Sequence, residues 1–371
     1  MNFSYWEYKT WLFNVDFVII GSGIVGLNCA LQLRNNFPKA KILILERGIL
    51  PNGASAKNAG FACFGSVSEI LEDLTTHNED EVLQLIKKRY EGLQILRKRL
   101  GDQAISYLQY GGYELFSKKD TSLLEKCLLK REKINTLLKP VFKEQVYHVR
   151  GNPFDFKNIT SQCIYNAFEG QIDTGKMMEA LIDKVQASGI KILYNCMVEN
   201  LSDHHSSVEI KTNHCTFFAN KVLIATNGFA SQLGITQVTP ARAQVLITRP
   251  IDNLHIKGTF HLDKGYYYFR NIDNRILLGG GRNLDFKAEE TTVLGQTELI
   301  QQKLEEMLRE VILPTTHFEI SHRWSGIMGV GSQKKSIIKP ISNNVFCGVR
   351  LGGMGVAIGS QVGTELADLL K

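Results

Sequence analysis

The first fifty residues consist of short apolar runs separated by a glycine-rich turn. Residues 16–20 (DFVII) are typical of a buried strand, and residues 24–35 carry apolar side chains at helical spacing. A second strand-like run, residues 41–46 (KILILE), follows. Strand, turn, helix and strand within about 30 residues form a βαβ unit, which predicts a parallel sheet in an α/β domain.

The pattern farther along the chain predicts more helices and strands. Asn78 is a good N-cap and Gly101 a good stop signal for a long helix between them. The other predicted elements are helices at 123–138, 173–188 and 292–312, a strand at 191–195, antiparallel strands within 198–224, and a strand-rich stretch at 245–280. We therefore expect a discontinuous nucleotide-binding domain (residues 1–85, 158–240 and 318–371) and a substrate domain (residues 86–157 and 241–317).

Composition restricts the class of protein. The 371 residues are 44% hydrophobic and 22% charged with a net charge of +6, which is typical of a folded soluble protein and excludes a disulfide miniprotein. Seven scattered cysteines without a CxxC pair predict reduced thiols and a cytoplasmic location. No apolar stretch reaches the ~18 residues of a membrane span.

Two groups of polar residues are interpreted as ordinary surface. The basic residues between Lys87 and Arg99 fit a solvated helix face, and the modest net charge makes a nucleic-acid partner unexpected. His204 and His205 lie at a predicted turn without a third ligand, so no metal site is predicted.

Residues 21–26 (GSGIVG) fit the pattern G-x-G-x-x-G between a strand and a helix. The glycines permit a tight turn, close approach of the backbone to a pyrophosphate and close helix–strand packing. Glu46 ends the next strand, where its carboxylate is placed to accept from ribose hydroxyls and to repel the 2′-phosphate of NADP. The alternative is a purely structural glycine turn. The predicted dinucleotide contacts are Gly21, Ser22, Gly23, Ile24, Val25, Gly26 and Glu46.

Residues 46–60 (ERGILPNGASAKNAG) resemble the second signature of the D-amino-acid oxidase (DAO) superfamily of FAD enzymes, which includes glycine, sarcosine and γ-glutamylputrescine oxidases. The resemblance extends over nearly the whole chain, through residues 170–181, 225–228 (ATNG), 240–244 (PARAQ, with Ala243 replacing the usual glycine) and 348–359 (GVRLGGMGVAIG). It implies an α/β FAD-binding Rossmann-like domain (GR2 type) with an inserted α+β substrate domain built on an antiparallel sheet.

The resemblance also implies cofactor contacts beyond the first loop. Sarcosine oxidases attach flavin through a cysteine, but none occurs between Cys215 and Cys347, so non-covalent FAD is expected. Cys63 follows a flavin-contacting segment and is interpreted as a packed thiol, with a redox role as the alternative. The implied contacts are Arg47, Ala54, Ser55, Asn58, Ala59, Gly60, Val198, Thr226, Asn227, Gly228, Gly326, Gly352, Gly353, Met354, Gly355, Val356 and Ala357.

The activity implied by the resemblance is that of an FAD-dependent amine or amino-acid oxidase or dehydrogenase. Hydride would pass from the carbon bearing the amine to flavin N5, the imine would hydrolyse, and oxygen or another acceptor would reoxidise the flavin. The family places an active-site tyrosine on the strand matching residues 265–270 (GYYYFR). Strand alternation puts Tyr266, Tyr268 and Arg270 on one face and Tyr267 and Phe269 on the other.

One departure from the family concerns the substrate carboxylate. Glycine and D-amino-acid oxidases hold it with an arginine, but the matching stretch, residues 323–328 (RWSGIM), has Met328 there and is more like the γ-glutamylputrescine type. Arg270, Arg323 or Arg350 would have to replace that arginine, or the acidic end of an amine substrate lies farther away. Oxidation of a 2-hydroxy acid or of a tRNA side chain, and a non-catalytic flavin-binding module, remain alternatives.

Overall fold

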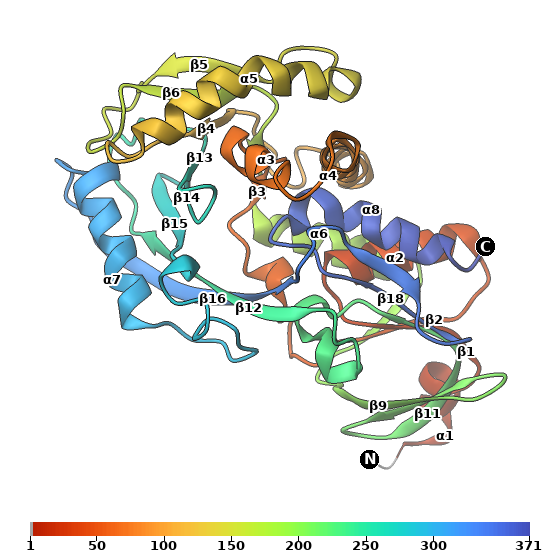
Figure 1. The fold of residues 1–371 in the computed structure, drawn as a ribbon. Helices are drawn as coiled ribbons and strands as arrows, with labels where there is room; N and C mark the ends of the chain where they lie inside the picture. Colours follow the sequence, from red (N-terminus) through yellow and green to blue (C-terminus); the bar gives the residue numbers. More distant parts are fainter. Residues whose placement is uncertain (1–2) are drawn as a thin grey trace.

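The computed structural model describes residues 3–371. Two eight-stranded sheets organise two lobes, at the lower right and upper left of Figure 1. The first sheet has the order β17 (Ile337–Pro340), β18 (Val345–Val349), β11 (Thr216–Ile224), β1 (Val15–Ile20), β2 (Ile42–Leu45) and β8 (Lys191–Leu193), with β10 (Val208–Thr212) and β9 (Val198–Asp203) as an antiparallel extension of β11. β1 pairs in parallel with β11 and β2, so the predicted parallel sheet is confirmed.

Helices from distant parts of the chain pack against one another beside this first sheet. α2 (Ile24–Asn36) packs on α8 (Gly355–Asp368), and α8 also packs on α4 (Glu79–Leu100). A Cβ atom on Gly363 would lie 2.5 Å from the Val25 carbonyl oxygen, and one on Gly92 would lie 2.3 Å from that of Ala357. These glycines let the three helices approach closely, and α6 (Thr174–Ala187) adds to the same hydrophobic cluster.

The second sheet carries the rest of the fold. Its order is β16 (Ile320–Val330), β12 (Thr239–Thr248), β15 (Arg275–Gly280), β14 (Tyr267–Ile272), β13 (Thr259–Leu262), β4 (Gly112–Glu114), β6 (Gln162–Asn166) and β5 (Tyr147–Gly151). α5 (Thr121–Phe142) and α7 (Glu298–Met307) lie at the outer side of this lobe (Figure 1). All neighbouring strands are antiparallel except β13 and β4, which are parallel.

Short segments connect the two lobes. Among these, β3 and β7 form a small antiparallel pair, and α3 begins at a capping box made by Ser66 and Glu69. The short elements are α1 (Tyr5–Glu7), η1 (Tyr8–Leu12), η2 (Ala54–Ala56), β3 (Phe61–Ala62), α3 (Val67–Asp73), β7 (Gly170–Gln171), η3 (Asn227–Leu233), η4 (Arg282–Leu284) and η5 (Leu308–Ile312).

The strand pairing differs from the predicted domain boundaries at three places. β6 and β16 were expected in the nucleotide-binding domain, but both lie in the second sheet, where β16 pairs with β12 along nearly its whole length. The boundary at residue 85 divides α4, a single helix that packs on α8. α5 also runs past its predicted end, through Pro140, because Leu138 and Phe142 are both buried in one hydrophobic cluster.

Two findings bear on the surroundings of the chain. No helix within residues 3–371 is long and apolar enough to cross a bilayer. All seven cysteines are unpaired, and six of them are buried.

Candidate active site

The predicted phosphate loop forms the turn between β1 and α2. A Cβ atom on Gly21 would lie 2.9 Å from the Ala225 carbonyl oxygen, and one on Gly26 would lie 2.0 Å from the carbonyl oxygen of Gly21. Gly23 caps α2 with no side-chain hydrogen bond of its own, and the Ser55 hydroxyl accepts from the Ile24 N–H at 2.9 Å instead. The N-terminus of α2 therefore opens onto a backbone-lined turn suited to phosphate oxygens.

Glu46 occupies the end of β2 beside this loop and is buried. Its Oε2 accepts from the Ser22 hydroxyl at 2.6 Å and from the Ser22 N–H at 3.2 Å, and its Oε1 accepts from the Gly48 N–H at 2.9 Å. These bonds fix the carboxylate next to the loop, and Glu46 lines the cavity described below.

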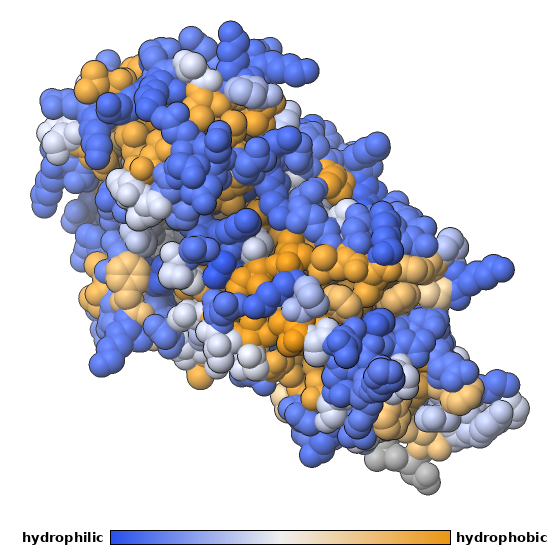
Figure 2. All heavy atoms as spheres, turned by 45° about the vertical axis from the view of Figure 1, so that its right-hand side comes forward, coloured by the Kyte–Doolittle hydropathy of each residue, from blue (hydrophilic) through white to orange (hydrophobic). Residues whose placement is uncertain are grey.

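One large cavity, of about 710 Å³, extends from this loop to the second sheet. In Figure 2, apolar side chains gather between the two lobes, while the outer faces are mainly hydrophilic. The Thr226 hydroxyl oxygen lies in the lining and is buried without a hydrogen-bond partner among the described residues. A buried polar atom of this kind fits a site that a polar ligand completes.

Most of the predicted cofactor contacts meet in this cavity. Gly26, Gly60, Gly228 and Ala357 instead lie behind it, where the three glycines allow close backbone packing. The predicted residues that line it are Gly21, Ser22, Gly23, Ile24, Val25, Glu46, Arg47, Ala54, Ser55, Asn58, Ala59, Val198, Thr226, Asn227, Gly326, Gly352, Gly353, Met354, Gly355 and Val356.

Asn227 and Asn58 hold two of the lining segments in shape. The Asn227 side-chain oxygen accepts from the N–H groups of Arg350 and Leu351 at 3.1 and 3.2 Å, which fixes the turn before the 352–355 loop. The Asn58 oxygen accepts from the Gly60 N–H at 2.8 Å and from the Thr174 hydroxyl at 2.9 Å. Both loops are thus positioned by side chains from the chain itself, ready to accept a cofactor.

The parallel sheet, the glycine turn at the N-terminus of α2, the buried carboxylate at the end of β2 and the 352–355 glycine loop are the features of a dinucleotide-binding oxidoreductase. The chain belongs to the FAD dependent oxidoreductase (DAO) family, which it matches over residues 16–369. It is therefore an FAD-dependent enzyme, and the residues described above fit that cofactor.

Individual relatives are distant. The chain is 21% identical to a probable oxidoreductase OrdL of Haemophilus influenzae, over 96% of this chain and 83% of that protein. It is 24% identical to an L-2-hydroxyglutarate dehydrogenase of Escherichia coli, over 74% of this chain and 65% of that protein. A glycine oxidase structure from Bacillus cereus superposes with a TM-score of 0.75 at 16% identity, covering 96% of this chain and 95% of that one.

The second sheet supplies an aromatic wall to the cavity. Tyr266 and Tyr268 line it, whereas Tyr267 and Phe269 are buried in the core on the other face, as the alternation predicted. The Tyr268 ring packs edge-on against Phe61, with the ring centres 5.5 Å apart. Burial raises the pKa of Tyr268 to about 12, so this phenol stays neutral at physiological pH.

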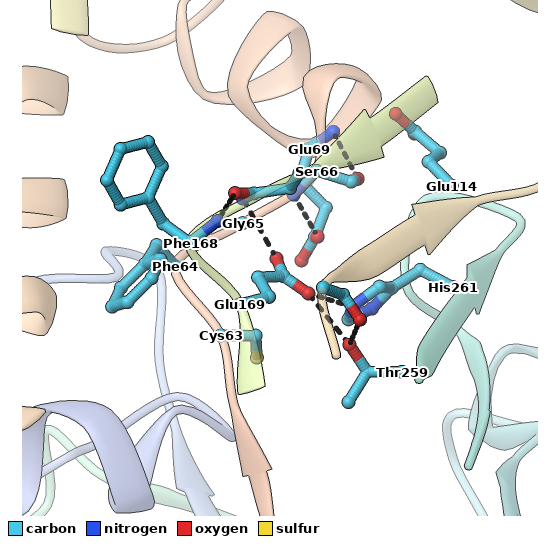
Figure 3. Close-up of polar contacts among 12 residues, drawn as sticks. Cys63, Phe64, Gly65, Ser66, Glu69, Glu114, Phe168, Glu169, Thr259 and His261 are labelled. Carbon is cyan, nitrogen blue, oxygen red and sulfur yellow. Dashed lines mark hydrogen bonds and ion pairs between the residues drawn. The ribbon is translucent and has the colours of Figure 1, made fainter. Parts of the chain in front are cut away.

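A buried ion pair between His261 and Glu169 lies next to this aromatic wall. His261 lines the cavity next to Phe61, and its Nε2 lies 3.0 Å from Oε2 of Glu169, which is 1% exposed. The Thr259 hydroxyl donates to the same Glu169 oxygen at 3.1 Å, and Figure 3 shows both side chains directed at this carboxylate. Burial alone would lower the pKa of His261, but the charge and hydrogen bond of Glu169 raise it to about 9.

The three arginines predicted to hold the substrate all lie outside the cavity lining. Arg270 is 2% exposed and donates to the carbonyl oxygens of Ala59 and Ile172. The Arg323 side chain bonds Gln301 and Glu305 on α7, and Arg350 Nε donates to the Lys335 carbonyl oxygen. Each of the three is hydrogen-bonded elsewhere in the fold and none lines the cavity, so the geometry does not support the expected substrate contact for any of them; Met328 does line the cavity.

Replacing Arg270 with glutamine is expected to destabilise the fold by about 2–4 kcal/mol, because the two buried carbonyl groups lose their charged partner. Arg270 joins β14 to Ala59 and to Ile172, which directly precedes the N-cap of α6. Urea unfolding of the holoenzyme measures the loss, with the exposed Arg249→Gln as control. If Arg270→Gln had an unchanged unfolding free energy and a raised KM, Arg270 would contact the substrate after all.

Several cavity residues were missed from the sequence. His261 and Glu169 are 92 positions apart and meet only through the pairing of β13 with β4 and of β4 with β6. Glu69 and Arg282 also line the cavity, from α3 and η4. A local signal existed only for Arg282, which directly follows the three glycines at the end of β15. Within residues 3–371, no cluster of three or more His, Cys, Asp or Glu side chains is placed to hold a metal ion.

Proposed function

We propose that this protein oxidises the C–N bond of an amine or amino acid and that water hydrolyses the resulting imine. The FAD supplies the hydride acceptor. The observation that carries the proposal is one continuous cavity, which joins the phosphate loop and the glycine loop at 352–355 to the wall of Phe61, Tyr266 and Tyr268. The similarity in fold to a glycine oxidase supports it.

The chain's own residues suit an amine at this wall. The Glu69 carboxylate lines the cavity and makes no ion pair within residues 3–371, so it stabilises an entering ammonium group. The tyrosine and phenylalanine faces add favourable cation–π contact. Once the amine is neutral, the same aromatic wall orients its C–H bond and excludes water.

A second candidate, oxidation of a 2-hydroxy acid, is favoured by the His261–Glu169 pair. Above the raised pKa of about 9, the neutral ring of His261, with its Nε2–H held by Glu169, would present Nδ1 as an acceptor for a hydroxyl proton, so this reaction would be favoured at alkaline pH. The relationship to L-2-hydroxyglutarate dehydrogenases points the same way. A tRNA substrate has less support, because Lys88 pairs with Glu365 and the buried Arg89 donates to the Phe64 carbonyl oxygen, so the basic helix is not the solvated face we expected.

Anaerobic titration of the purified holoenzyme with amines, amino acids and 2-hydroxy acids tests the proposal. We expect an amine or amino acid to bleach the flavin absorbance, and admission of oxygen then tells oxidase from dehydrogenase by the rate at which the colour returns. Bleaching by 2-hydroxy acids alone would make the second candidate correct. FAD that none of these compounds reduces would indicate a non-catalytic module.

Non-covalent FAD and a cytoplasmic location are further parts of this proposal. The two cysteines in the cavity lining are Cys63 and Cys196, and burial raises the pKa of both thiols, of Cys196 to about 11. Protonated thiols are poor nucleophiles, which supports a flavin that is not attached through sulfur. The seven unpaired cysteines support a reducing compartment.

A further inference from the structure

The carboxylate of an amino-acid substrate would require a cationic side chain in the cavity, and the arginine typical of the family is absent. Met328 lines the cavity where the family resemblance places an arginine, and its thioether cannot hold a carboxylate. Arg270, Arg323 and Arg350 donate to other groups of the fold. Any anion anchor must therefore come from another cation in the cavity lining.

Most of those cations are already engaged or lie with the cofactor segments, and protonated His261 is held by Glu169 at 3.0 Å. Lys264 pairs with Glu72 at 3.3 Å and Lys334 pairs with Asp73 at 2.6 Å, both at the α3 side of the cavity. Arg47 stacks on Phe229 at the nucleotide end, and Lys57 lies on the cofactor segment against Gly326.

Arg282 differs from all of these. It lines the cavity at the start of η4, immediately after Gly281 adopts a left-handed φ of 79° that turns the chain out of β15. Its guanidinium carbon lies 4.8 Å from the centre of the Phe286 ring, and the group has no hydrogen bond or ion pair within residues 3–371. Burial lowers the pKa of Arg282, as expected for a guanidinium held partly out of water without a partner.

The surroundings of Arg282 leave its charge available. Glu289, the carboxylate whose charge raises the pKa of Arg282, is itself held by Arg242 at 2.7 Å and by Gln244 at 3.0 Å. Tyr266 lies beside Arg282, since the Gly281 N–H donates to the Tyr266 carbonyl oxygen at 3.0 Å. The cation–π contact with Phe286 uses none of the guanidinium N–H donors, which leaves them available for bidentate bonding.

We propose that Arg282 binds the substrate's carboxylate, in place of the arginine that Met328 replaces, and that the substrate is an amine bearing a carboxylate. This inference rests on the proposed function and adds a substrate class to it. The carboxylate then lies at the Tyr266 and η4 end of the aromatic wall. Glu69 also lines the cavity and carries the opposite charge, so the lining offers a cation for the carboxylate of an amino acid and a carboxylate for its ammonium group.

Arg282→Gln and Arg282→Lys test the proposal, with the exposed Arg249→Gln as control. Binding of acetate and succinate to each holoenzyme is measured from the change in flavin absorbance, which requires no turnover. We expect Arg282→Gln to weaken binding roughly 10- to 100-fold, and Arg282→Lys to fall between because it keeps the charge but loses the planar fork. Equal affinity in Arg282→Gln and the parent would overturn the proposal.

Turnover separates this inference from the proposed function. Glycine, sarcosine, L-proline and 4-aminobutyrate are each compared with their amides. We expect Arg282→Gln to raise the KM of the acid by a similar factor, with little change in kcat and none for the amide. Oxidation by the parent of amines without carboxylates alone would make the Arg282 assignment wrong and leave the proposed function standing. Carboxylate binding that depends on Arg282, in an enzyme whose flavin no amine or amino acid reduces, would support the Arg282 assignment and make the proposed function wrong.

If Arg282→Gln fails to fold or to hold FAD, the lysine variant decides. Lysine retains a cation for the Phe286 ring, so weaker acetate binding together with an unchanged KM for an amide supports the assignment. Unchanged acetate binding in that variant overturns it.

Discussion

Replacing Glu46 with alanine is expected to yield a folded protein that binds FAD at least ~100-fold more weakly. The carboxylate accepts from the Ser22 hydroxyl, the Ser22 N–H and the Gly48 N–H, and it is the acceptor that we predict for the ribose hydroxyls. Loss of two charge-assisted hydrogen bonds, at about 1.5–3 kcal/mol each, accounts for an effect of this size. Equilibrium dialysis or quenching of flavin fluorescence during titration measures it.

Two further variants make this prediction specific. Glu46→Gln keeps the shape of the side chain and removes its charge, so it should lie between the parent and Glu46→Ala. Glu199→Ala removes an exposed ion pair with Lys211 between strands β9 and β10. This control variant should bind FAD as the parent does. Parental FAD affinity in Glu46→Ala would show that the carboxylate serves only to shape the loop.

The Glu169→Gln variant is expected to abolish a large pH dependence of stability. The pKa of His261 is raised to about 9 in the folded protein, against about 6.5 in an unfolded chain. A group with a raised folded pKa stabilises the fold fully below pH ~6.5 and loses that contribution as the pH rises through ~9. The difference corresponds to roughly 3 kcal/mol, which the parent should lose over this range and the variant should not.

Urea unfolding of both proteins at several pH values between 6 and 10, chosen at about one-unit steps, measures the difference. Other titrating groups contribute equally to both proteins, so the difference between their curves isolates the His261–Glu169 pair. Glu319→Gln, which removes an exposed ion pair, should reproduce the parental curve. Parallel curves for Glu169→Gln and the parent would mean that His261 is neutral throughout.

The parts of the site that were predictable from the sequence depend on local spacing. The loop at residues 21–26 and Glu46 lie within one βαβ unit, so their relative positions follow from the geometry of strand, turn and helix. The alternation on β14 correctly assigned Tyr268 to the cavity and Phe269 to the core. These statements needed no knowledge of the tertiary contacts.

Contacts over long sequence distances were not predictable in this way. Alternation placed Arg270 on the correct face of β14, but it does not reveal that backbone carbonyls 98 and 211 positions away take up its donors. The pair of His261 and Glu169 depends on the insertion of β4 between β13 and β6. The sheet that β6 and β16 join was not predictable either, because hydrogen bonding to the neighbouring strand, rather than hydrophobic pattern, decides it.

The strand order of the first sheet has a consequence for how the protein is made. β1 pairs with β11, about two hundred positions later in the sequence, and β11 pairs in turn with β18, which ends at Val349. During synthesis, β1 and β2 therefore leave the ribosome long before their remaining partners exist. Such non-local pairing slows folding. Capture of FAD is then a late event, since the glycine loop that completes the site follows β18 in the chain.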